Sequence, residues 1–140
     1  MEIVEVKYQA ICNALNKLKT ILEKLHSHQF EALHEEMRDS AIKRFEFCMD
    51  TFWKFLKVYL TEVLKIQPEK ASPRHIFYLC LQQQLISNEE LAVLEDLVGD
   101  RNLTSHTYNE ELAESISENI PKYYHTMNEI IARFKIERVQ

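Results

Sequence analysis

The scarcity of glycine and proline constrains this chain more than any other sequence feature. Its 140 residues include one glycine and three prolines, where average usage would give about ten and seven. Folds rich in β-strands, and folds that alternate strands with helices, need these residues at their turns. A single glycine also excludes the glycine-rich phosphate-binding loops, which need two or more at fixed spacing. We therefore expect one domain over residues 1–140, built mostly of long helices.

Apolar residues recur every three or four positions, as on the buried face of a helix. In the first predicted helix they form a seam that needs a partner helix, made of Ile11, Leu15, Leu18, Leu22 and Leu25. The pattern predicts helices at about residues 5–27, 33–64 and 73–84, a fourth that begins after residue 87, and a fifth from about 107 to 138. The predicted fold class is all-α, an up-and-down four-helix bundle with about five helices.

The helix boundaries carry capping signals. Ser72–Pro73 is typical of an N-cap followed by proline at the first helical position. Ser87–Glu90 and Thr107–Glu110 both have the spacing of a capping box. Gly99 is expected to loosen the last turn of the fourth helix or to mark its end, and Pro121 to kink or restart the fifth.

Charge is unevenly distributed along the chain. The net charge is -5, which argues against a protein that binds nucleic acid by bulk attraction. Residues 1–85 carry 12 basic and 11 acidic groups, and residues 121–140 carry four basic and two acidic groups. Residues 86–120 carry nine acidic groups and one basic group, Arg101. One arginine thus stands alone in the most acidic part of the chain.

The segment Asp100–Tyr108 brings a guanidinium, an amide, hydroxyls, an imidazole and a phenol together. One interpretation is a solvated ion pair between Arg101 and Asp100, Asp96 or a glutamate of the fifth helix. The other is a site in which Arg101 binds phosphate oxygens and His106 transfers protons. On a regular helix the offset between Arg101 and His106 rotates by about 140°, so their side chains diverge. They converge only if the helix ends or distorts between them, or if two chains face each other.

This segment resembles the signature of the HEPN superfamily: an arginine, four residues, a histidine, one residue and a tyrosine. More closely, the whole chain resembles the HEPN family called nucleotidyltransferase substrate-binding proteins, the toxin halves of HEPN/MNT pairs. The resemblance also rests on blocks in the expected order, Arg44–Phe47, Trp53–Lys57 and Ser72–Arg74. The chain departs from the family pattern at Asp50, where a glutamate is usual, and at Cys48–Met49.

The resemblance implies a homodimer in which two motifs face each other across a shared cleft. Members with an intact motif are similar to metal-independent ribonucleases, so RNA is the implied substrate and neither a metal nor a cofactor is expected. The implied catalytic residues are Arg101, which stabilises phosphoryl charge, His106 as general base or acid, and Asn102 as an orienting group. Supporting roles fall to Asp100, which could orient Arg101, and to Thr104, Ser105, Lys54 and Lys57. If the second helix borders the cleft, its lysines could supply a positive field.

The implied partner is a minimal nucleotidyltransferase, which in some pairs transfers AMP to the tyrosine of the motif, here Tyr108. Such a modification would block the cleft by its bulk and negative charge. Two alternatives stay open. The chain could be a non-catalytic subunit that binds substrate or nucleotide for a nucleotidyltransferase, or a structural dimer whose polar motif only satisfies an interface.

The cysteines and the remaining histidines are expected to have structural or surface roles. Cys12, Cys48 and Cys80 lie within apolar patterns and are typical of reduced core thiols in a cytoplasmic protein. His26 and His28 are two residues apart and cannot share a helix face, so no metal site is expected there. The first residues lack the features of a signal peptide, and no uncharged run is long enough to span a bilayer.

Overall fold

The computed structural model describes residues 2–27 and 32–136. Over this range the chain is helical and contains no β-strand, which confirms the predicted all-α class. The elements, in order, are α1 (Glu2–His26), α2 (His34–Glu62), α3 (Pro73–Gln82), α4 (Asn88–Leu103), the short 3-10 helix η2 (Thr104–His106) and α5 (Glu110–Ala132).

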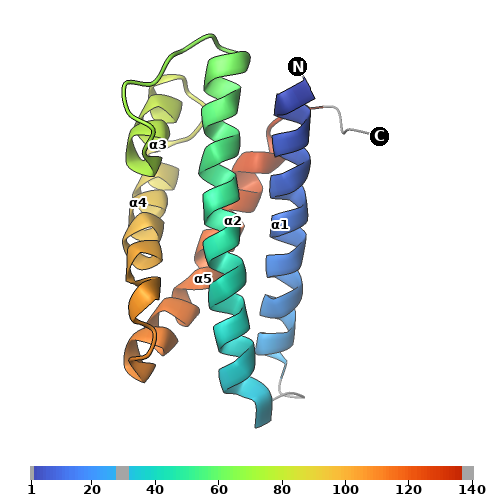
Figure 1. Ribbon diagram of the computed structural model, residues 1–140, viewed down its shortest axis with the longest axis vertical. Helices are drawn as coiled ribbons and strands as arrows, with labels where there is room; N and C mark the ends of the chain where they lie inside the picture. The colour runs from blue at the N-terminus through green and yellow to red at the C-terminus, as the bar shows by residue number, and fades with distance from the viewer. Residues whose placement is uncertain (1, 28–31, 137–140) are drawn as a thin grey trace.

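The four longer helices run alternately up and down (Figure 1). In that view α1 and α4 run downward, α2 and α5 run upward, and α5 crosses behind α2. The short α3 lies beside the upper part of α4. The lower end of α4, where the Asp100–Tyr108 segment begins, therefore lies at the same end of the bundle as the start of α2.

The core is built on the aromatic side of α2. Phe45 and Phe52 are fully buried. Phe45 stacks on Tyr123 of α5 with ring centroids 5.6 Å apart, and Phe52 packs on Phe77 of α3 at 5.8 Å. The predicted seam of α1 also faces inward: its first three members, Ile11, Leu15 and Leu18, are buried. Burial of large side chains of this kind stabilises the fold by about 1.5–3 kcal/mol each.

The capping predictions were right at α4 and wrong at α5. Ser87 Oγ accepts a hydrogen bond from the backbone N–H of Glu90 at 3.1 Å, and the Glu90 carboxylate accepts one from the N–H of Ser87 at 2.9 Å. The N-cap of α5 is Asn109, whose side-chain oxygen accepts from the N–H of Leu112. Thr107 does not cap α5, because its hydroxyl donates to the carbonyl oxygen of Thr104 in η2.

The two predicted helix breakers do not break their helices. Helix α4 continues through Gly99 to Leu103, and a Cβ at Gly99 would meet nothing within 4 Å. Pro121 lies inside α5 without a restart, although it removes one backbone N–H from the helix. Helix α5 ends at Ala132, six residues before its predicted end at Arg138, which lies outside the described residues.

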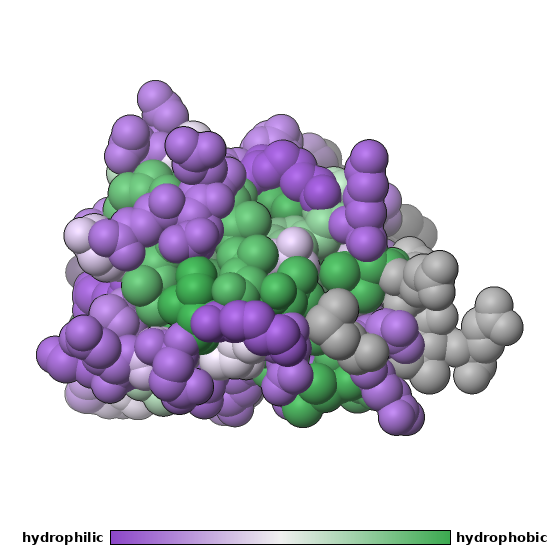
Figure 2. All heavy atoms as spheres, turned by 90° about the horizontal axis from the view of Figure 1, so that it is seen from above, coloured by the Kyte–Doolittle hydropathy of each residue, from purple (hydrophilic) through white to green (hydrophobic). Residues whose placement is uncertain are grey.

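Apolar side chains reach the surface at the upper end of the bundle. Figure 2 looks down on this end and shows a central apolar area inside a polar rim. Ile3 and Val6, in the first two turns of α1, are each 49% exposed. This end lies away from the Asp100–Tyr108 segment, so it plays no part in the candidate site.

Candidate functional site

Arg101 lies in the last turn of α4 and reaches across to α2. Its Nε and Nη2 donate to the two carboxylate oxygens of Asp50 at 3.3 and 3.0 Å. Its Nη1 donates to Glu46 Oε2 at 3.1 Å and to Thr104 Oγ1 at 3.1 Å. The hydrogen bond with Asp50 raises the pKa of Arg101; burial opposes this, and the charges of Asp50 and Glu46 support it. The guanidinium is therefore fixed in place as a permanent cation.

The two carboxylates reach Arg101 because of their spacing on α2. Glu46 and Asp50 are four residues apart, so they lie one above the other on one face of the helix. Their side chains are 20% and 42% exposed, and that of Arg101 is 28% exposed. The cluster is thus half-buried: water reaches one side of it, and a ligand could too.

The interpretation in which Arg101 pairs with Asp100, Asp96 or a glutamate of the fifth helix was wrong, because its carboxylate partners are Asp50 and Glu46. Asp100 faces α5 instead, where its Oδ2 accepts from the hydroxyl of Tyr123 at 2.6 Å and from the amide of Asn119 at 3.1 Å. Adjacent residues on a helix point about 100° apart, which explains why Asp100 and Arg101 have different partners. Asp100 therefore ties α4 to α5 and does not orient Arg101 directly.

Thr104 is the buried member of the motif, at 5% exposure. Its hydroxyl donates to the carbonyl oxygen of Arg101 at 2.7 Å while it accepts from the Arg101 guanidinium. This pair of bonds closes the end of α4, where η2 begins. The Thr104 side chain thus holds Arg101 in position and is too buried to contact a ligand.

Four other predicted site residues of the motif face solvent. Asn102, Ser105 and His106 are exposed, and Tyr108 is 84% exposed. The rings of His106 and Tyr108 meet edge to face with centroids 6.1 Å apart. Within the described residues, no hydrogen bond joins His106 to Arg101. The helix does end between the two residues, but Arg101 turns toward α2 while His106 stays exposed on η2.

Lys54 and Lys57 lie along α2 beyond Asp50. They are four and seven residues further on, which is about 6 and 10.5 Å along the helix axis. Lys54 is exposed and Lys57 half-buried. The second helix borders the Arg101 cluster because Glu46 and Asp50 bind the guanidinium, and the role of the two lysines stays a prediction.

A second ionic cluster, centred on Arg38, was not predicted from the sequence. Its side chain is only 3% exposed, yet it donates to Glu110 and Glu114 at 2.8 and 3.0 Å, and to Asp39. His34 Nε2 lies 3.1 Å from the same Glu114. The hydrogen bond to Glu110 is the main cause that raises the pKa of Arg38. This cluster holds the first turns of α5 against the start of α2, directly after Tyr108.

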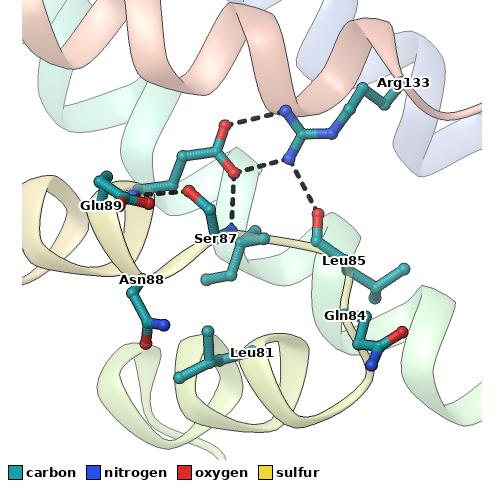
Figure 3. Close-up of a pocket in the computed structure, with 9 residues that line it drawn as sticks. Leu81, Gln84, Leu85, Ser87, Asn88, Glu89 and Arg133 are labelled. Carbon is teal, nitrogen blue, oxygen red and sulfur yellow. Dashed lines mark hydrogen bonds and ion pairs between the residues drawn. The ribbon is translucent and has the colours of Figure 1, made fainter.

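A cavity of about 710 Å³ lies at the other end of α4. There the Arg133 guanidinium binds both oxygens of Glu90, at 2.8 and 2.7 Å, and the carbonyl oxygen of Leu85 (Figure 3). Ser87, which lines this cavity, precedes Arg101 by fourteen residues, or about 21 Å along the helix. The cavity is therefore separate from the motif.

The described part of the chain contains no group of three or more histidine, cysteine or acidic side chains that could hold a metal ion. None of the helices in this part is long and apolar enough to cross a membrane. Cys48 and Cys80 are buried and Cys12 is half-buried, and all three are free thiols.

One protein family matches this chain over nearly its whole length. A family model described as "Nucleotidyltransferase substrate binding protein like" matches residues 6–136. The chain belongs to this family. A match of this extent covers α2, α4, η2 and α5, and with them every residue of the Arg101 cluster. No protein with a curated description matches the chain significantly.

Three solved structures are similar to this member of the nucleotidyltransferase substrate-binding family. A protein from Thermus thermophilus is 36% identical, with a TM-score of 0.73 over 86% of this chain and 97% of its own. A mutant of the toxin–antitoxin MntA-HpeT is 19% identical, with a TM-score of 0.69. A toxin–antitoxin crystallised with AMP-PNP is 17% identical, with a TM-score of 0.69. The last two matches each cover 94% of this chain and 96% of the other, and at this identity they show a shared fold.

Proposed function

We propose that this protein is a HEPN-type toxin of a toxin–antitoxin pair, and that it cleaves RNA without a metal ion. Three observations support the proposal. The chain belongs to the nucleotidyltransferase substrate-binding family, it shares the fold of toxin–antitoxin proteins, and it carries the complete Arg-x4-His-x-Tyr motif. The observation that carries it is the fixed Arg101 cation beside exposed polar groups of the same motif.

The proposed reaction uses the ribose itself as the nucleophile. The 2′-hydroxyl attacks the adjacent phosphorus, so a P–O2′ bond forms and the P–O5′ bond breaks, leaving a 2′,3′-cyclic phosphate and a 5′-hydroxyl. His106 takes the proton from the 2′-hydroxyl or gives one to the leaving 5′-oxygen. Arg101 stabilises the charge that develops on the phosphoryl oxygens, and Asn102 orients the phosphate by hydrogen bonding.

The divergence of Arg101 and His106 within one chain favours a site shared between two chains. In a homodimer with a two-fold axis, each His106 faces the Arg101 of the other protomer. Leu103, which lies within the motif and is 41% exposed, is an apolar surface that suits such an interface. The proposed dimer thus brings Arg101 and His106 side chains together, which a single chain does not.

The proposed partner is a minimal nucleotidyltransferase that neutralises the toxin. Its chemistry joins the phenol oxygen of Tyr108 to the α-phosphorus of ATP, with release of pyrophosphate and the phenolic proton. The exposure of Tyr108 makes its oxygen accessible to a second protein. The added phosphate would stand beside His106 and exclude RNA by charge and bulk.

A second candidate function is a non-catalytic subunit that binds a nucleotide for the nucleotidyltransferase. One observation favours it: Glu46 and Asp50 already accept three hydrogen bonds from Arg101, and together they outnumber its positive charge. Such a subunit binds a nucleotide or its partner and leaves RNA intact.

Cleavage assays in EDTA separate the two functions. The proteins are the wild type, His106→Ala and the matched control His125→Ala, which removes a histidine that is 71% exposed on α5. Cleavage by the wild type and the control, with cyclic-phosphate ends, and none by His106→Ala supports the ribonuclease. Intact RNA with all three proteins, on several RNAs, refutes it and favours the binding subunit.

A further inference from the structure

A groove between α1 and α2 lies outside the motif. It has a volume of about 480 Å³. Its lining residues come from two helices, Ala14 and Lys17 from α1 and Ser40, Lys43, Arg44 and Phe47 from α2. Three of the six are cationic and none is acidic, which is unusual on a protein whose net charge is -5.

The cations of this groove are available to an anionic ligand. Arg44 Nη1 donates to the backbone carbonyl oxygen of Lys17 at 2.8 Å, and no carboxylate of residues 2–27 and 32–136 pairs with it. Within the described residues, Lys17 also has no ion pair. Lys43 is 82% exposed, and its Nζ lies 3.6 Å from Glu46 Oε1. Exposed pairs of this kind are weak, so a phosphate can replace the carboxylate.

Phe47 gives the groove an aromatic surface. Its side chain is 62% exposed, in contrast to the neighbouring Phe45, which is fully buried. Packing in the core therefore does not account for it. Proteins bind single-stranded nucleic acid with cations placed along its phosphate backbone and with exposed aromatic rings on which its bases stack.

The groove adjoins the Arg101 cluster at Glu46, whose carboxylate lies between Lys43 and Arg101. One oxygen of this carboxylate contacts Lys43, and the other accepts from Arg101. Phe47 precedes Asp50 by three residues, or about 4.5 Å along α2. A strand bound in the groove therefore lies close to the guanidinium at which cleavage is proposed.

We infer that the groove formed by Lys17, Lys43, Arg44 and Phe47 binds the backbone of single-stranded RNA, and that Phe47 stacks on a base. This inference rests on the proposed ribonuclease function and extends it to a second binding surface. It also resolves a conflict of charge: residues 86–120 are acidic and repel RNA, whereas the three cations that line the groove attract it. The occupant is a nucleic acid because the groove combines positive charge with an aromatic ring.

The test measures binding to a single-stranded RNA of about 12 nucleotides with 2′-O-methyl riboses, which lacks the attacking hydroxyl. Fluorescence anisotropy over a range of salt concentrations gives the affinity and its salt dependence. The variants are Lys17→Ala with Arg44→Ala, and separately Phe47→Ala. The matched control is Lys70→Ala with Arg74→Ala, which removes the same charge at two exposed positions beyond the far end of α2.

We expect the Lys17/Arg44 variant to lower the salt slope by about 1.4, since each lost phosphate contact on a single strand accounts for about 0.7. Phe47→Ala should weaken binding about tenfold, and the control should change neither quantity beyond its overall loss of charge.

Unchanged affinity and slope in both groove variants overturn the inference. So does a shift of Phe47→Ala from dimer to monomer by sedimentation, because it assigns the groove to a second copy of the chain. If the variants bind RNA more weakly but the wild type does not cleave it, the ribonuclease function is refuted and RNA binding in the groove is supported. If the wild type cleaves RNA but the variants bind it as well as the wild type, the ribonuclease function is supported and RNA binding in the groove is refuted. Absence of RNA binding by the wild type refutes both.

Discussion

The ion pair between Arg101 and Asp50 can be measured as a coupling free energy. A double-mutant cycle with Arg101→Ala and Asp50→Ala isolates the pair from the rest of the fold. A parallel cycle with Arg101→Ala and Asp100→Ala is the matched control, since Asp100 is adjacent in sequence but faces Tyr123. The structure predicts coupling in the first cycle and none in the second.

The magnitude follows from the geometry. Two hydrogen bonds join the guanidinium to Asp50, at 3.3 and 3.0 Å, and the side chains are 28% and 42% exposed. Fully exposed pairs couple by about 0.2–1 kcal/mol, and truncating one partner of a buried pair costs about 3–5 kcal/mol. A half-buried, two-bond pair screened on one side by water should fall between them, at about 1–2 kcal/mol.

The assay is equilibrium unfolding in urea with the wild type, the single variants and the double variants. Arg101→Ala alone should lower the free energy of unfolding by about 2 kcal/mol, because it leaves Glu46 and Asp50 facing each other as like charges four residues apart. For a chain of this length that corresponds to about 8 °C in Tm. Coupling below about 0.3 kcal/mol with Asp50, or above about 0.5 kcal/mol with Asp100, would refute this account of the site.

Three further predictions concern other parts of the molecule. The hydrogen bonds from Arg133 lower the pKa of Glu90 below its ordinary value of 4.5, so their stabilisation is present above that pH and is lost on acidification. In Arg133→Met, the free energy of unfolding in urea should therefore fall less between neutral pH and pH values below 4.5 than it does in the wild type. An equal fall in both proteins contradicts this. Burial raises the pKa of the Cys48 and Cys80 thiols to about 12, so a thiol reagent should label them only as fast as the protein unfolds; rapid labelling of either in the native state is the contrary result. Because Tyr108 is 84% exposed, Tyr108→Phe should change the unfolding free energy by less than about 0.5 kcal/mol and should abolish AMP transfer by the partner, as mass spectrometry would detect.

The fold could be predicted from the sequence because its determinants are local. The near absence of glycine, the helical spacing of apolar residues and the capping box at Ser87 all report on their own helix. The wrong predictions concern contacts that depend on a second element of the fold. Thr107 has the residue type and spacing of an N-cap, but its hydroxyl donates to a carbonyl oxygen of η2, and Asn109 caps α5 instead.

The sequence predicted two members of the Arg101 cluster but not the carboxylates that bind the guanidinium. Arg101 and Thr104 both belong to the motif and hydrogen-bond each other, whereas Glu46 and Asp50 come from α2, about fifty residues earlier in the chain. Glu46 lies on a helix side that the sequence pattern indicates as solvated. The i, i+4 spacing of Glu46 and Asp50, facing the single arginine of an acidic segment, is the signal that could have identified the pair.

The buried Arg38 had no comparable signal. Nothing near it in sequence distinguishes it from an exposed arginine, and its carboxylates at Glu110 and Glu114 lie more than seventy residues away. Only the packing of α2 against α5 makes this ionic cluster, so a single sequence offers no means of finding it.

The most direct test of the shared-site proposal is to mix two inactive variants. Arg101→Ala and His106→Ala are purified separately, shown to be folded dimers, then mixed under conditions that exchange subunits, and assayed for RNA cleavage in EDTA. If Arg101 of one chain works with His106 of the other, each mixed dimer has one intact site, and the mixture should recover about a quarter of wild-type activity. An active wild type with a mixture that stays inactive after exchange would contradict the shared site.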